Sequence, residues 1–560
     1  MSISSRLWLR CYDTALASAT SPFVVSLSRG SLVKSSFKAY IAQDAFYLIS
    51  FKKAFASAAT ICRKDLDVFG VDHFETLEVL IEDELKMHAK FAHDLDIDIS
   101  SVSPLPATLL YTEFLGEASK TNYISHICAA MTPCMTLYGW LGRRADSSGL
   151  AHTSHPYLRW IQEYSSKEFE THAQRLEMLL DHYADKDGQS YDDLVKLYAK
   201  AMELEYNFFS AHETENWTGI TPKLLCIDFD DTISVGDTIS SLCKAGLKAQ
   251  QKSEAIHEEL FQSYLAEYQK FMSLNLPEKV VESGNFKRDD IDKFLGKYST
   301  FEDSMLTPVE QAGLLKGISP ECLTKVAAEM PMKAGAIDTI EYAINSCPSM
   351  ETHILSVNWS RRFLQSMMTY NSPTSRVQIH ANELIGLHEE TSEDNLESIS
   401  TGCIQRVMTG PQQKGEMLQS IIAKNENSHP NVYIGDSLGD LSALLESDIG
   451  IIIGKSSSIR KVCSTYGVEL QTVDQLVLNT DAGSAQTVAV NRKKPVLYTA
   501  ESWPHIGFCL FGKRYVSNWL NKEVKTFSRG YHGSARSGRE APKVLSVAGS
   551  DSGVRERKSP

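Results

Sequence analysis

The sequence predicts a multidomain fold in which an all-α bundle is followed by an α/β domain that carries a helical cap. Up to about residue 218, apolar side chains recur every three or four residues with no competing strand-like alternation, which is typical of packed helices. Beyond that point, short apolar runs that end in polar side chains alternate with helix-like stretches, as in a parallel sheet covered by helices. A long helical stretch, 236–330, separates the first of these runs from the next and is predicted to form the cap.

Length, charge and cysteine usage limit the classes of protein. At 560 residues the chain is too long for a single core. A net charge of −14 argues against a nucleic-acid-binding body, and no apolar run approaches the roughly 18 residues that a membrane span needs. The 11 cysteines form no CxxC pairs, so we expect reduced thiols rather than a disulfide framework. We therefore expect neither a nucleic-acid partner nor a membrane partner.

The first 36 residues bear on the compartment. They are rich in Ser and carry four basic side chains but only one acid, Asp13, a composition that organelle-targeting segments share. A helix-like pattern of Leu7, Trp8, Tyr12 and Leu16 nevertheless begins within them, which indicates that they belong to the fold. We expect a cytoplasmic protein, with a mitochondrial one as the alternative.

Six helical segments are predicted in the first domain, residues 1–218. The first has an apolar face that includes Tyr40, Tyr47 and Phe51, and Asp44 interrupts this face. Prolines and clusters of Asp, Ser and Gly separate the later segments. The predicted helices span residues 37–59, 73–93, 107–119, 123–141, 156–183 and 191–213.

Three polar residues in this domain invite chemistry. Asp44 needs a partner if it is buried, because an unpaired buried carboxylate costs several kcal/mol, although tyrosine hydroxyls or a neighbouring helix could satisfy it. Cys134 follows Pro133, with Tyr138 one turn further on, but a cysteine is more often a small buried hydrophobe than a nucleophile. Glu205 lies among aromatic residues, where desolvation raises the pKa of a carboxyl, unless its side chain faces solvent.

These residues occur in four motifs, residues 21–24 (SPFV), 43–48 (QDAFYL), 133–134 (PC) with Tyr138, and 205–209 (EYNFF), which occur in the same order in the TenA family. The chain resembles these thiamine-salvage aminohydrolases, which have a haem-oxygenase-like helical bundle, over about residues 4–217. The resemblance implies that Cys134 adds as a nucleophile to an aminopyrimidine ring and that Glu205 donates a proton to the departing ammonia. It also implies substrate-binding residues, of which Tyr111 and Tyr164 are placed by approximate spacing: Asp44 at the amino and nitrogen edge of the ring, and Tyr47, Tyr111, Tyr138 and Tyr164 as its walls.

The second half is arranged around an apolar run, 224–227, that is followed by Asp228, Asp230 and Asp231. A buried parallel strand whose carboxyl end opens into a site has this pattern. Because Asp228 and Asp230 are two apart on an extended chain, their side chains point to the same face. Carboxylates placed in this way repel each other unless a cation lies nearby, which predicts a Mg²⁺ site. An acidic turn after a strand is the plainer alternative.

Three later runs resemble strands. One, 353–358, contains Ser356; another, 432–440, contains Asp436 and Asp440; the third is 449–454. Lys414 begins a helix-like run and could offset the carboxylates while it holds a phosphoryl oxygen. Taken singly, Ser356 would be an ordinary strand-end serine and Lys414 a solvated surface lysine. Because active sites of parallel sheets lie beyond the carboxyl ends of the strands, we expect these side chains to lie together.

The ordered pattern of Asp-x-Asp-x-Thr, Ser, Lys and Gly-Asp-x-x-x-Asp resembles the haloacid dehalogenase-like phosphatases over roughly residues 222–510. The resemblance implies an α/β Rossmannoid fold in which Asp228 forms an aspartyl-phosphate and Asp230 protonates the leaving group and then activates water. Ser356 and Lys414 would bind the phosphoryl group. The implied cofactor is Mg²⁺, with a metal site made of Asp228, the backbone carbonyl of Asp230, Asp436 and Asp440, the last of which would hold the metal's waters or orient Lys414.

The phosphatase-like domain is predicted to span residues 219–513. A basic tail rich in Gly and Ser, 514–560, follows it and is predicted to be mostly disordered. Within the tail, residues 543–553 resemble the first strand and glycine turn of hydroxymethylpyrimidine kinases, and the similarity stops at Val554. So short a piece cannot make a kinase, so we expect no kinase activity and interpret it as a truncated fusion or a gene-model artefact.

Together the two resemblances imply a bifunctional hydrolase of thiamine salvage, of a plant type, that acts on small molecules. The helical domain would convert 4-amino-5-aminomethyl-2-methylpyrimidine to hydroxymethylpyrimidine and ammonia, and the α/β domain would convert thiamine monophosphate to thiamine. A homo-oligomer formed through the helical domain is expected. Two alternatives stay open: the phosphatase acts on another small ester, such as a pyrimidine or sugar phosphate, or the helical domain is a non-catalytic module for binding or oligomerisation.

Overall fold

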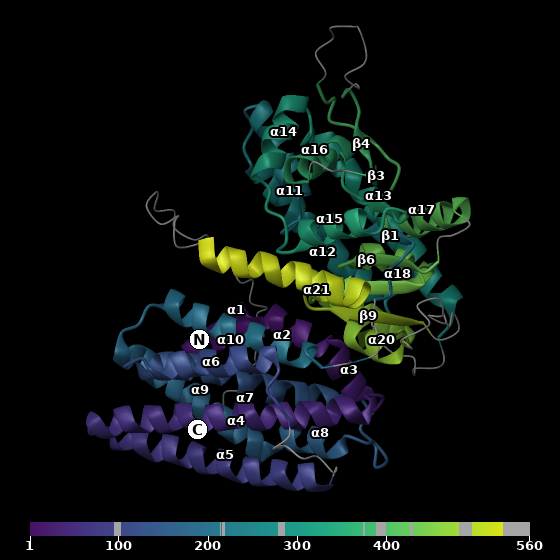
Figure 1. The fold of residues 1–560 in the computed structure, drawn as a ribbon. Coiled ribbons are helices and arrows are strands. Elements are labelled where there is room, and N and C mark those ends of the chain that lie inside the picture. The colour runs from purple at the N-terminus through teal and green to yellow at the C-terminus, as the bar shows by residue number, and fades with distance from the viewer. Residues whose placement is uncertain are drawn as a thin grey trace, which may run out of the picture.

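The computed structural model describes residues 1–94, 102–212, 214, 219–277, 286–372, 376–387, 399–425, 429–480 and 495–529. A helical part and an α/β part lie one above the other, and the long helix α21 (Trp503–Arg529) runs along the boundary between them (Figure 1). The predicted fold class is confirmed, because an all-α domain precedes a parallel α/β domain with a helical cap. Among the described helices, none combines the length and hydrophobicity that crossing a bilayer requires.

Side-chain caps set several helix boundaries in the first domain. The Ser21 side chain accepts a hydrogen bond from the Val24 backbone N–H, and Pro22 occupies the first helical position, where its missing N–H costs nothing. Ser190 caps its helix in the same way. The helices of the described part are α1 (Ile3–Arg10), α2 (Tyr12–Ala19), α3 (Pro22–Arg29), α4 (Lys34–Lys64), α5 (Val68–Asp94), α6 (Pro106–Ser119), α7 (Ile124–Ser147), α8 (Leu158–Ser165), α9 (Lys167–Asp187) and α10 (Tyr191–Ser210).

The prediction of one continuous helix over 156–183 is wrong, because Ser166 divides this segment into α8 and α9. Ser166 has extended backbone angles, φ −67° and ψ 150°, and its side chain accepts a hydrogen bond from the Phe169 backbone N–H. Glu168 and Glu170 then occupy the first turn of α9, where they face the positive end of the helix dipole. A capped helix start therefore overrides the continuous apolar periodicity.

The second domain contains a seven-stranded parallel sheet with the strand order β3-β2-β1-β6-β7-β9-β8. Strand β1 is fully buried and lies between β2 and β6, so that Ile227 is in register with Ile354 on one side and with Ile434 on the other. Four strands match the predicted runs, whereas β3, β8 and β9 were not predicted. The strands are β1 (Leu224–Ile227), β2 (Glu351–Leu355), β3 (Val377–His380), β6 (Asn431–Gly435), β7 (Ile449–Ile453), β8 (Glu469–Thr472) and β9 (Val496–Ala500).

Helices occupy the insert between β1 and β2 that was predicted as a cap. They are α11 (Ile239–Ala249), α12 (Ala255–Asn275), α13 (Arg288–Ala312) and α14 (Pro320–Glu329). A two-stranded antiparallel sheet of β4 (Glu383–Leu384) and β5 (Ile404–Gln405) lies further along the chain. The remaining elements are α15 (Ala336–Ser346), α16 (Arg361–Asn371), α17 (Pro411–Lys424), the 3₁₀ turn η2 (Leu438–Asp440), α18 (Leu441–Glu446), α19 (Ser457–Tyr466) and α20 (Val473–Asn479).

The predicted start of a disordered tail at Arg514 is wrong, because α21 continues to Arg529. Gly512, at φ 62°, bends the helix, and the chain then continues as a second helical stretch. Tyr515, Val516, Trp519 and Leu520 recur at helical spacing and are buried, with the Tyr515 ring edge-on to Tyr342 of α15. Residues 530–560, including the kinase-like piece 543–553, lie outside the described residues.

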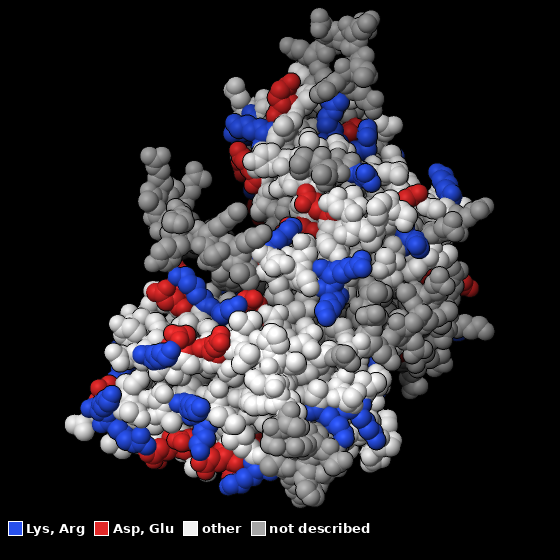
Figure 2. All heavy atoms as spheres, in the orientation of Figure 1, with Lys and Arg blue, Asp and Glu red and all other residues white. Residues whose placement is uncertain are grey.

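The two domains share an apolar core. Leu16, Ala17, Val25 and Tyr206 of the helical domain belong to the same buried cluster as the apolar side chains of the sheet and of α21. Helix α2 contacts α21, and α3 contacts α20. On the face drawn in Figure 2, the described acidic and basic side chains are interspersed over both domains rather than gathered by sign.

Polar contacts tie this interface together. Arg144 of α7 pairs with Asp474 of α20, and Asp474 also accepts a contact from His505 Nε2 at 3.2 Å. The Tyr12 hydroxyl donates to Glu501 Oε2 at 2.8 Å, and the Arg29 guanidinium donates to backbone carbonyls at the end of α20, including Leu478 O at 2.6 Å. The helical and α/β domains are therefore packed as one body.

Candidate active sites

The first site lies beyond the carboxyl end of β1, where the sequence predicted it. The backbone N–H of Asp228 donates to Ile434 O at 2.8 Å, so the ladder to β6 fixes the chain at the residue that follows the strand. The next residues turn away in a loop, and the Thr232 carbonyl accepts a hydrogen bond from Trp503 Nε1 at 2.8 Å. Helix α21 thus supports the loop that carries the acidic residues.

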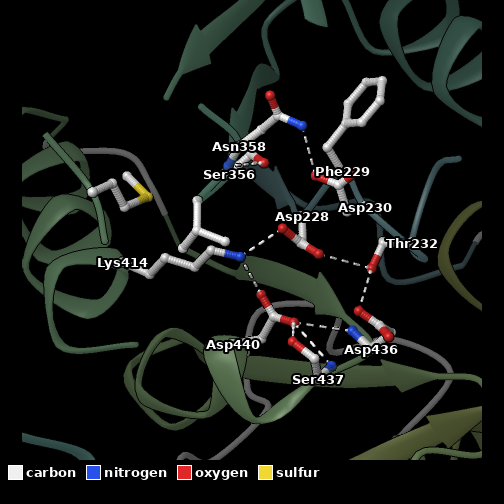
Figure 3. A network of polar contacts seen from close by, with 12 residues as sticks. Asp228, Phe229, Asp230, Thr232, Ser356, Asn358, Lys414, Asp436, Ser437 and Asp440 are labelled. Carbon is white, nitrogen blue, oxygen red and sulfur yellow. Dashed lines mark hydrogen bonds and ion pairs between the residues drawn. The ribbon is translucent and has the colours of Figure 1, made fainter. Parts of the chain in front are cut away.

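Lys414 connects two carboxylates of the site (Figure 3). It lies in the first turn of α17, and its Nζ is 2.5 Å from Asp228 Oδ1 and 2.7 Å from Asp440 Oδ1. Its side chain is 1% exposed, so the alternative of a solvated surface lysine does not hold. Burial acts to lower the pKa of Lys414, but the two carboxylates outweigh burial, and the pKa lies above its usual value. A permanent positive charge therefore faces Asp228.

Asp440 is held by five hydrogen bonds, which occupy both of its carboxylate oxygens. Oδ1 accepts from Lys414 Nζ and from the Tyr433 hydroxyl at 2.8 Å. Oδ2 accepts from the backbone N–H groups of Asp436 and Ser437, at 3.1 and 3.0 Å, and from Ser437 Oγ at 3.0 Å. A Cβ at Gly435 would overlap the Asp440 carboxylate, so this close approach requires glycine. The geometry favours the orienting role for Asp440 over direct contact with a metal.

Three acids, Asp228, Asp436 and Asp440, bring carboxylate oxygens within 4.8 Å of one another. The Thr232 hydroxyl lies 3.3 Å from Asp228 Oδ2 and 3.4 Å from Asp436 Oδ1. Burial, followed by repulsion from Asp440, raises the pKa of Asp228 to about 7 and that of Asp436 to about 8, although Lys414 opposes both shifts. One lysine cannot neutralise three carboxylates, and oxygen donors are the ligands that hard dications prefer. The carboxylates of Asp228 and Asp436 therefore fit a metal ion, with Asp440 beside them as the acid that orients Lys414.

Asp230 directs its side chain away from this group of acids. Its Oδ1 accepts from the Thr238 backbone N–H at 2.8 Å and from Thr238 Oγ1 at 2.5 Å, and its Oδ2 accepts from Asn358 Nδ2 at 3.1 Å. Burial raises the pKa of Asp230, against the opposing effect of these hydrogen bonds. A carboxyl of this kind, at the edge of the site, suits proton transfer. The role of the Asp230 backbone carbonyl as a ligand of the metal stays a prediction.

Ser356 follows β2, the neighbour of β1, and is fully buried. Its Oγ accepts a hydrogen bond from the Asn358 backbone N–H at 3.1 Å, and Figure 3 shows both residues beside Asp228 and Asp230. Asn358 and Thr238, which together position Asp230, were not predicted from the sequence. The only signal for Asn358 was its place two residues after Ser356, on the same face of an extended chain.

A cavity of about 380 Å³ lies over these residues and extends under the cap. Asp228, Asp230, Lys414 and Asp436 line its sheet side. Apolar and aromatic residues of the cap and of the loop after β2 line much of the rest, together with two acids of the cap, Asp237 and Glu302. These include Leu260, Phe261, Tyr264, Tyr298, Met305, Leu306, Val309 and Trp359. The volume is that of a small-molecule site.

The second site lies inside the helical domain. Tyr111 OH donates to Glu205 Oε1 at 2.7 Å, and Tyr47 OH donates to Tyr111 OH at 3.4 Å. Glu205 is 1% exposed and also has a hydrogen-bonding contact with the thiol of Cys134. The alternative of a solvent-facing glutamate therefore does not hold. Burial raises the pKa of Glu205 to about 7, while Tyr111 and Cys134 act to lower it.

Asp44, Tyr47, Cys134, Tyr138 and Tyr164 line one small cavity, so most of the predicted residues of this site converge. Its volume, about 20 Å³, holds little more than one water molecule, so a pyrimidine ring would have to displace side chains on entry. Burial raises the pKa of Asp44 and, with repulsion from Glu205, that of the Cys134 thiol. The thiol therefore needs a base nearby in order to ionise.

Glu84 also lines this cavity and was not predicted from the sequence. Its Oε1 accepts a hydrogen bond from Tyr164 OH at 3.3 Å, and burial raises its pKa to about 7. Glu84 directly follows Glu82 and Asp83 on α5, so three consecutive acids look alike in the sequence. Helical spacing was the one available signal, because Glu84 lies three residues after Ile81 and seven after Leu77 on the apolar face of α5.

Comparisons of this sequence with those of known proteins find matches to the helical domain and to nearly the whole chain. A profile of the TENA/THI-4/PQQC family matches residues 15–215. The chain is 32% identical to the "Bifunctional TH2 protein, mitochondrial" of Arabidopsis thaliana, over 90% of this chain and 88% of that protein. It is 29% identical over 225 residues to the aminopyrimidine aminohydrolase of Halalkalibacterium halodurans, which covers 39% of this chain and 98% of that protein. A solved substrate-bound phosphoserine phosphatase covers 43% of this chain and 90% of its own, at 20% identity and a TM-score of 0.29.

Proposed function

Because the chain belongs to the family of the bifunctional TH2 protein, we propose that it is a hydrolase with two active sites, one in each domain. The α/β domain is proposed to be a phosphomonoesterase that uses an aspartyl-phosphate. The helical domain is proposed to hydrolyse 4-amino-5-aminomethyl-2-methylpyrimidine to hydroxymethylpyrimidine and ammonia. Thiamine monophosphate is proposed as the phosphatase substrate, since its product thiamine belongs to the same metabolism as the substrate of the helical domain.

One observation supports the phosphatase most strongly: Lys414 lies between Asp228 and Asp440 on the floor of the cavity. Lys414 would attract the phosphoryl group and offset the charge of Asp228 as the two anions meet. An Asp228 oxygen forms a bond to phosphorus while the bond from phosphorus to the ester oxygen breaks. Asp230 donates its proton to the departing alkoxide, for which its raised pKa is suited.

The second half of the reaction reverses the role of Asp230. The ionised carboxylate takes a proton from a water molecule as the water oxygen bonds to phosphorus, and the bond from phosphorus to Asp228 breaks. Inorganic phosphate leaves, and both aspartates return to their starting states. Asp228, Asp436 and the Asp230 carbonyl would hold Mg²⁺, which would neutralise charge on the phosphoryl oxygens when bound.

The aminohydrolase proposal is supported by the contact of Glu205 with Cys134 and by the tyrosines around them. Ionised Glu205 accepts the proton of Cys134 as the sulfur bonds to a ring carbon. The electron pair pushed through the ring expels the exocyclic amine, and Glu205 returns the proton to the leaving nitrogen. Water then adds to the exocyclic carbon, the bond between carbon and sulfur breaks, and the thiol regains its proton.

Two variants of the full chain test both proposals, because each serves as the control of the other. Asp228→Asn is expected to lose phosphate release from thiamine monophosphate and to retain ammonia release from the aminopyrimidine. Cys134→Ala is expected to show the opposite pattern. Full ammonia release by Cys134→Ala would remove the nucleophile assignment, and an absence of ammonia release from the wild type would leave the helical domain as a binding module.

Two proposals concern the state of the protein in the cell. Resemblance to TenA supports a homo-oligomer formed through the helical domain, which sedimentation of the full chain would test. For the compartment we propose the cytoplasm, with the mitochondrion as the alternative that the name of the Arabidopsis relative supports. Fractionation of cells that express the full chain would decide between them.

A further inference from the structure

The cavity of the α/β domain contains a polar group that the proposed reaction does not use. Glu302 of α13 lines the same cavity as Asp228 but belongs to the cap rather than to the sheet edge. The Tyr264 hydroxyl of α12 donates to Glu302 Oε1 at 2.9 Å, and the Tyr298 hydroxyl also forms a hydrogen bond with this carboxylate. Two cap helices thus hold one acid in place at the wall of the cavity.

The charges around the cavity are strongly unequal. Among the described residues that line it, Lys414 is the only Lys or Arg, and Asp228 and Asp440 already pair with it. Burial lowers the pKa of His257, the histidine of this lining, so that it is neutral near pH 7. The cap side therefore offers no cation to a second anionic group of a substrate. Burial raises the pKa of Glu302, and a bound cation would favour its ionised form, so this carboxyl suits a cationic group and would repel an anionic one.

Aromatic rings line the same cavity as this acid, and two of them, Tyr264 and Tyr298, contact it. The cavity is lined by four aromatic residues, Phe261, Tyr264, Tyr298 and Trp359. The first three belong to α12 and α13, the two cap helices that carry Tyr264 and Glu302. The faces of aromatic rings attract cations, and they also stack on flat heterocycles. A carboxylate beside several aromatic side chains is the combination that recognises organic cations.

We propose that Glu302, with Tyr264, Tyr298 and Trp359, forms a cation-binding subsite in the cap that selects phosphate monoesters whose alcohol portion carries a flat, positively charged ring. This inference rests on the proposed phosphatase function and names the part of the chain that chooses its substrate. Glu302 would contact the leaving group and take no part in bond breaking. Tyr264 is a positioning residue, because its hydroxyl acts through the carboxylate.

The test compares two esters with the full-length protein in Mg²⁺. Thiamine monophosphate has a cationic leaving group, and p-nitrophenyl phosphate has a neutral aromatic one. Glu302→Gln is expected to lower kcat/KM for thiamine monophosphate about tenfold, mainly through KM, and to leave p-nitrophenyl phosphate within about twofold. The inhibition constant of thiamine, measured against p-nitrophenyl phosphate, is expected to rise by a similar factor.

Two further variants separate recognition from folding. Glu267→Gln makes the same change on α12, where Glu267 is exposed, pairs with Lys270 at 3.2 Å and does not line the cavity, so both substrates should react as in the wild type. Tyr264→Phe keeps the ring and removes the hydroxyl that holds Glu302. It should show a smaller loss that is again confined to thiamine monophosphate.

The outcomes distinguish this inference from the proposal beneath it. If Glu302→Gln slows both esters equally, or neither, Glu302 does not read the cation and the inference is overturned while the phosphatase stands. The same holds if the wild type hydrolyses p-nitrophenyl phosphate but not thiamine monophosphate. If the wild type releases phosphate from neither ester, the proposed function fails, and the inference fails with it.

Discussion

Replacing Asp440 by Asn removes one charge from the phosphatase site while keeping the shape of the side chain. The two backbone N–H groups that donate to Oδ2 cannot turn away, so the amide oxygen must stay there and the NH₂ group must take the place of Oδ1. That NH₂ group then faces Lys414 Nζ and the Tyr433 hydroxyl. The hydroxyl can rotate to accept a hydrogen bond, but the ammonium cannot.

When the protein is measured in Mg²⁺, which would offset the repulsion of Asp440 on Asp228 and Asp436, the expected cost follows from this single lost contact. A hydrogen bond to a charged group contributes about 1.5–3 kcal/mol, so we expect Asp440→Asn to lower the free energy of unfolding by roughly 2–3 kcal/mol. For a domain of about 295 residues, that corresponds to a decrease in Tm of about 3–5 °C. Asp440→Ala should cost more, because it also leaves the two backbone N–H groups buried without an acceptor.

Thermal unfolding of the full chain, followed by circular dichroism, measures this effect. Asp338→Asn is a matched control, because Asp338 is about half exposed and pairs across the surface with Lys522 at 2.7 Å, and such pairs contribute about 0–1 kcal/mol. Phosphatase turnover of Asp440→Asn should also fall at least about tenfold, since Lys414 loses an orienting partner. A Tm indistinguishable from that of the wild type, with full turnover, would refute the assigned role of Asp440.

Three other predictions follow from the structure. The kcat/KM for ammonia release should fall as the pH decreases through about 7, because protonated Glu205 cannot accept the proton of Cys134. A pH profile that stays flat from about 8 to about 5.5 would contradict this expectation. Chelation by EDTA should abolish phosphate release and leave ammonia release intact, and added Mg²⁺ should restore phosphate release. Loss of both activities would argue against a metal confined to the α/β domain. Arg144→Leu should lower stability by about 1–3 kcal/mol, because it leaves the mostly buried Asp474 with His505 alone, and chemical denaturation would detect it.

Much of the phosphatase site could be predicted because its residues follow strands. Runs such as 224–227 are buried on both faces and therefore nearly uniformly apolar, and the acid after each run marks the carboxyl end of a strand. The strands that were missed lie mostly towards the margins of the sheet. No residue of β3 or β8 is fully buried, and Gln378, His380 and Gln471 interrupt their apolar patterns.

Side-chain direction was less accessible to sequence reasoning. Period-two alternation placed Asp228 and Asp230 on the same face, yet the chain leaves the strand at Asp228, and Asp230 turns towards Thr238 and Asn358. Alternation applies only while the backbone stays extended. In the helical domain the pattern located Asp44, Cys134 and Glu205. Glu84 lies on the same face of α5 as Leu77 and Ile81 and could have been chosen by this spacing, but its contact with Tyr164 depends on packing between helices.

The apolar side chains that Leu16, Val25 and Tyr206 contribute to the core of the neighbouring domain have a consequence for any attempt to divide this protein. A cut near residue 218 would leave an exposed apolar surface on each fragment, and such fragments are expected to precipitate or to need a solubilising partner. A mutation that unfolds one half should also destabilise the other, so a single damaging substitution is expected to remove both proposed activities. The two domains depend on each other physically for their stability.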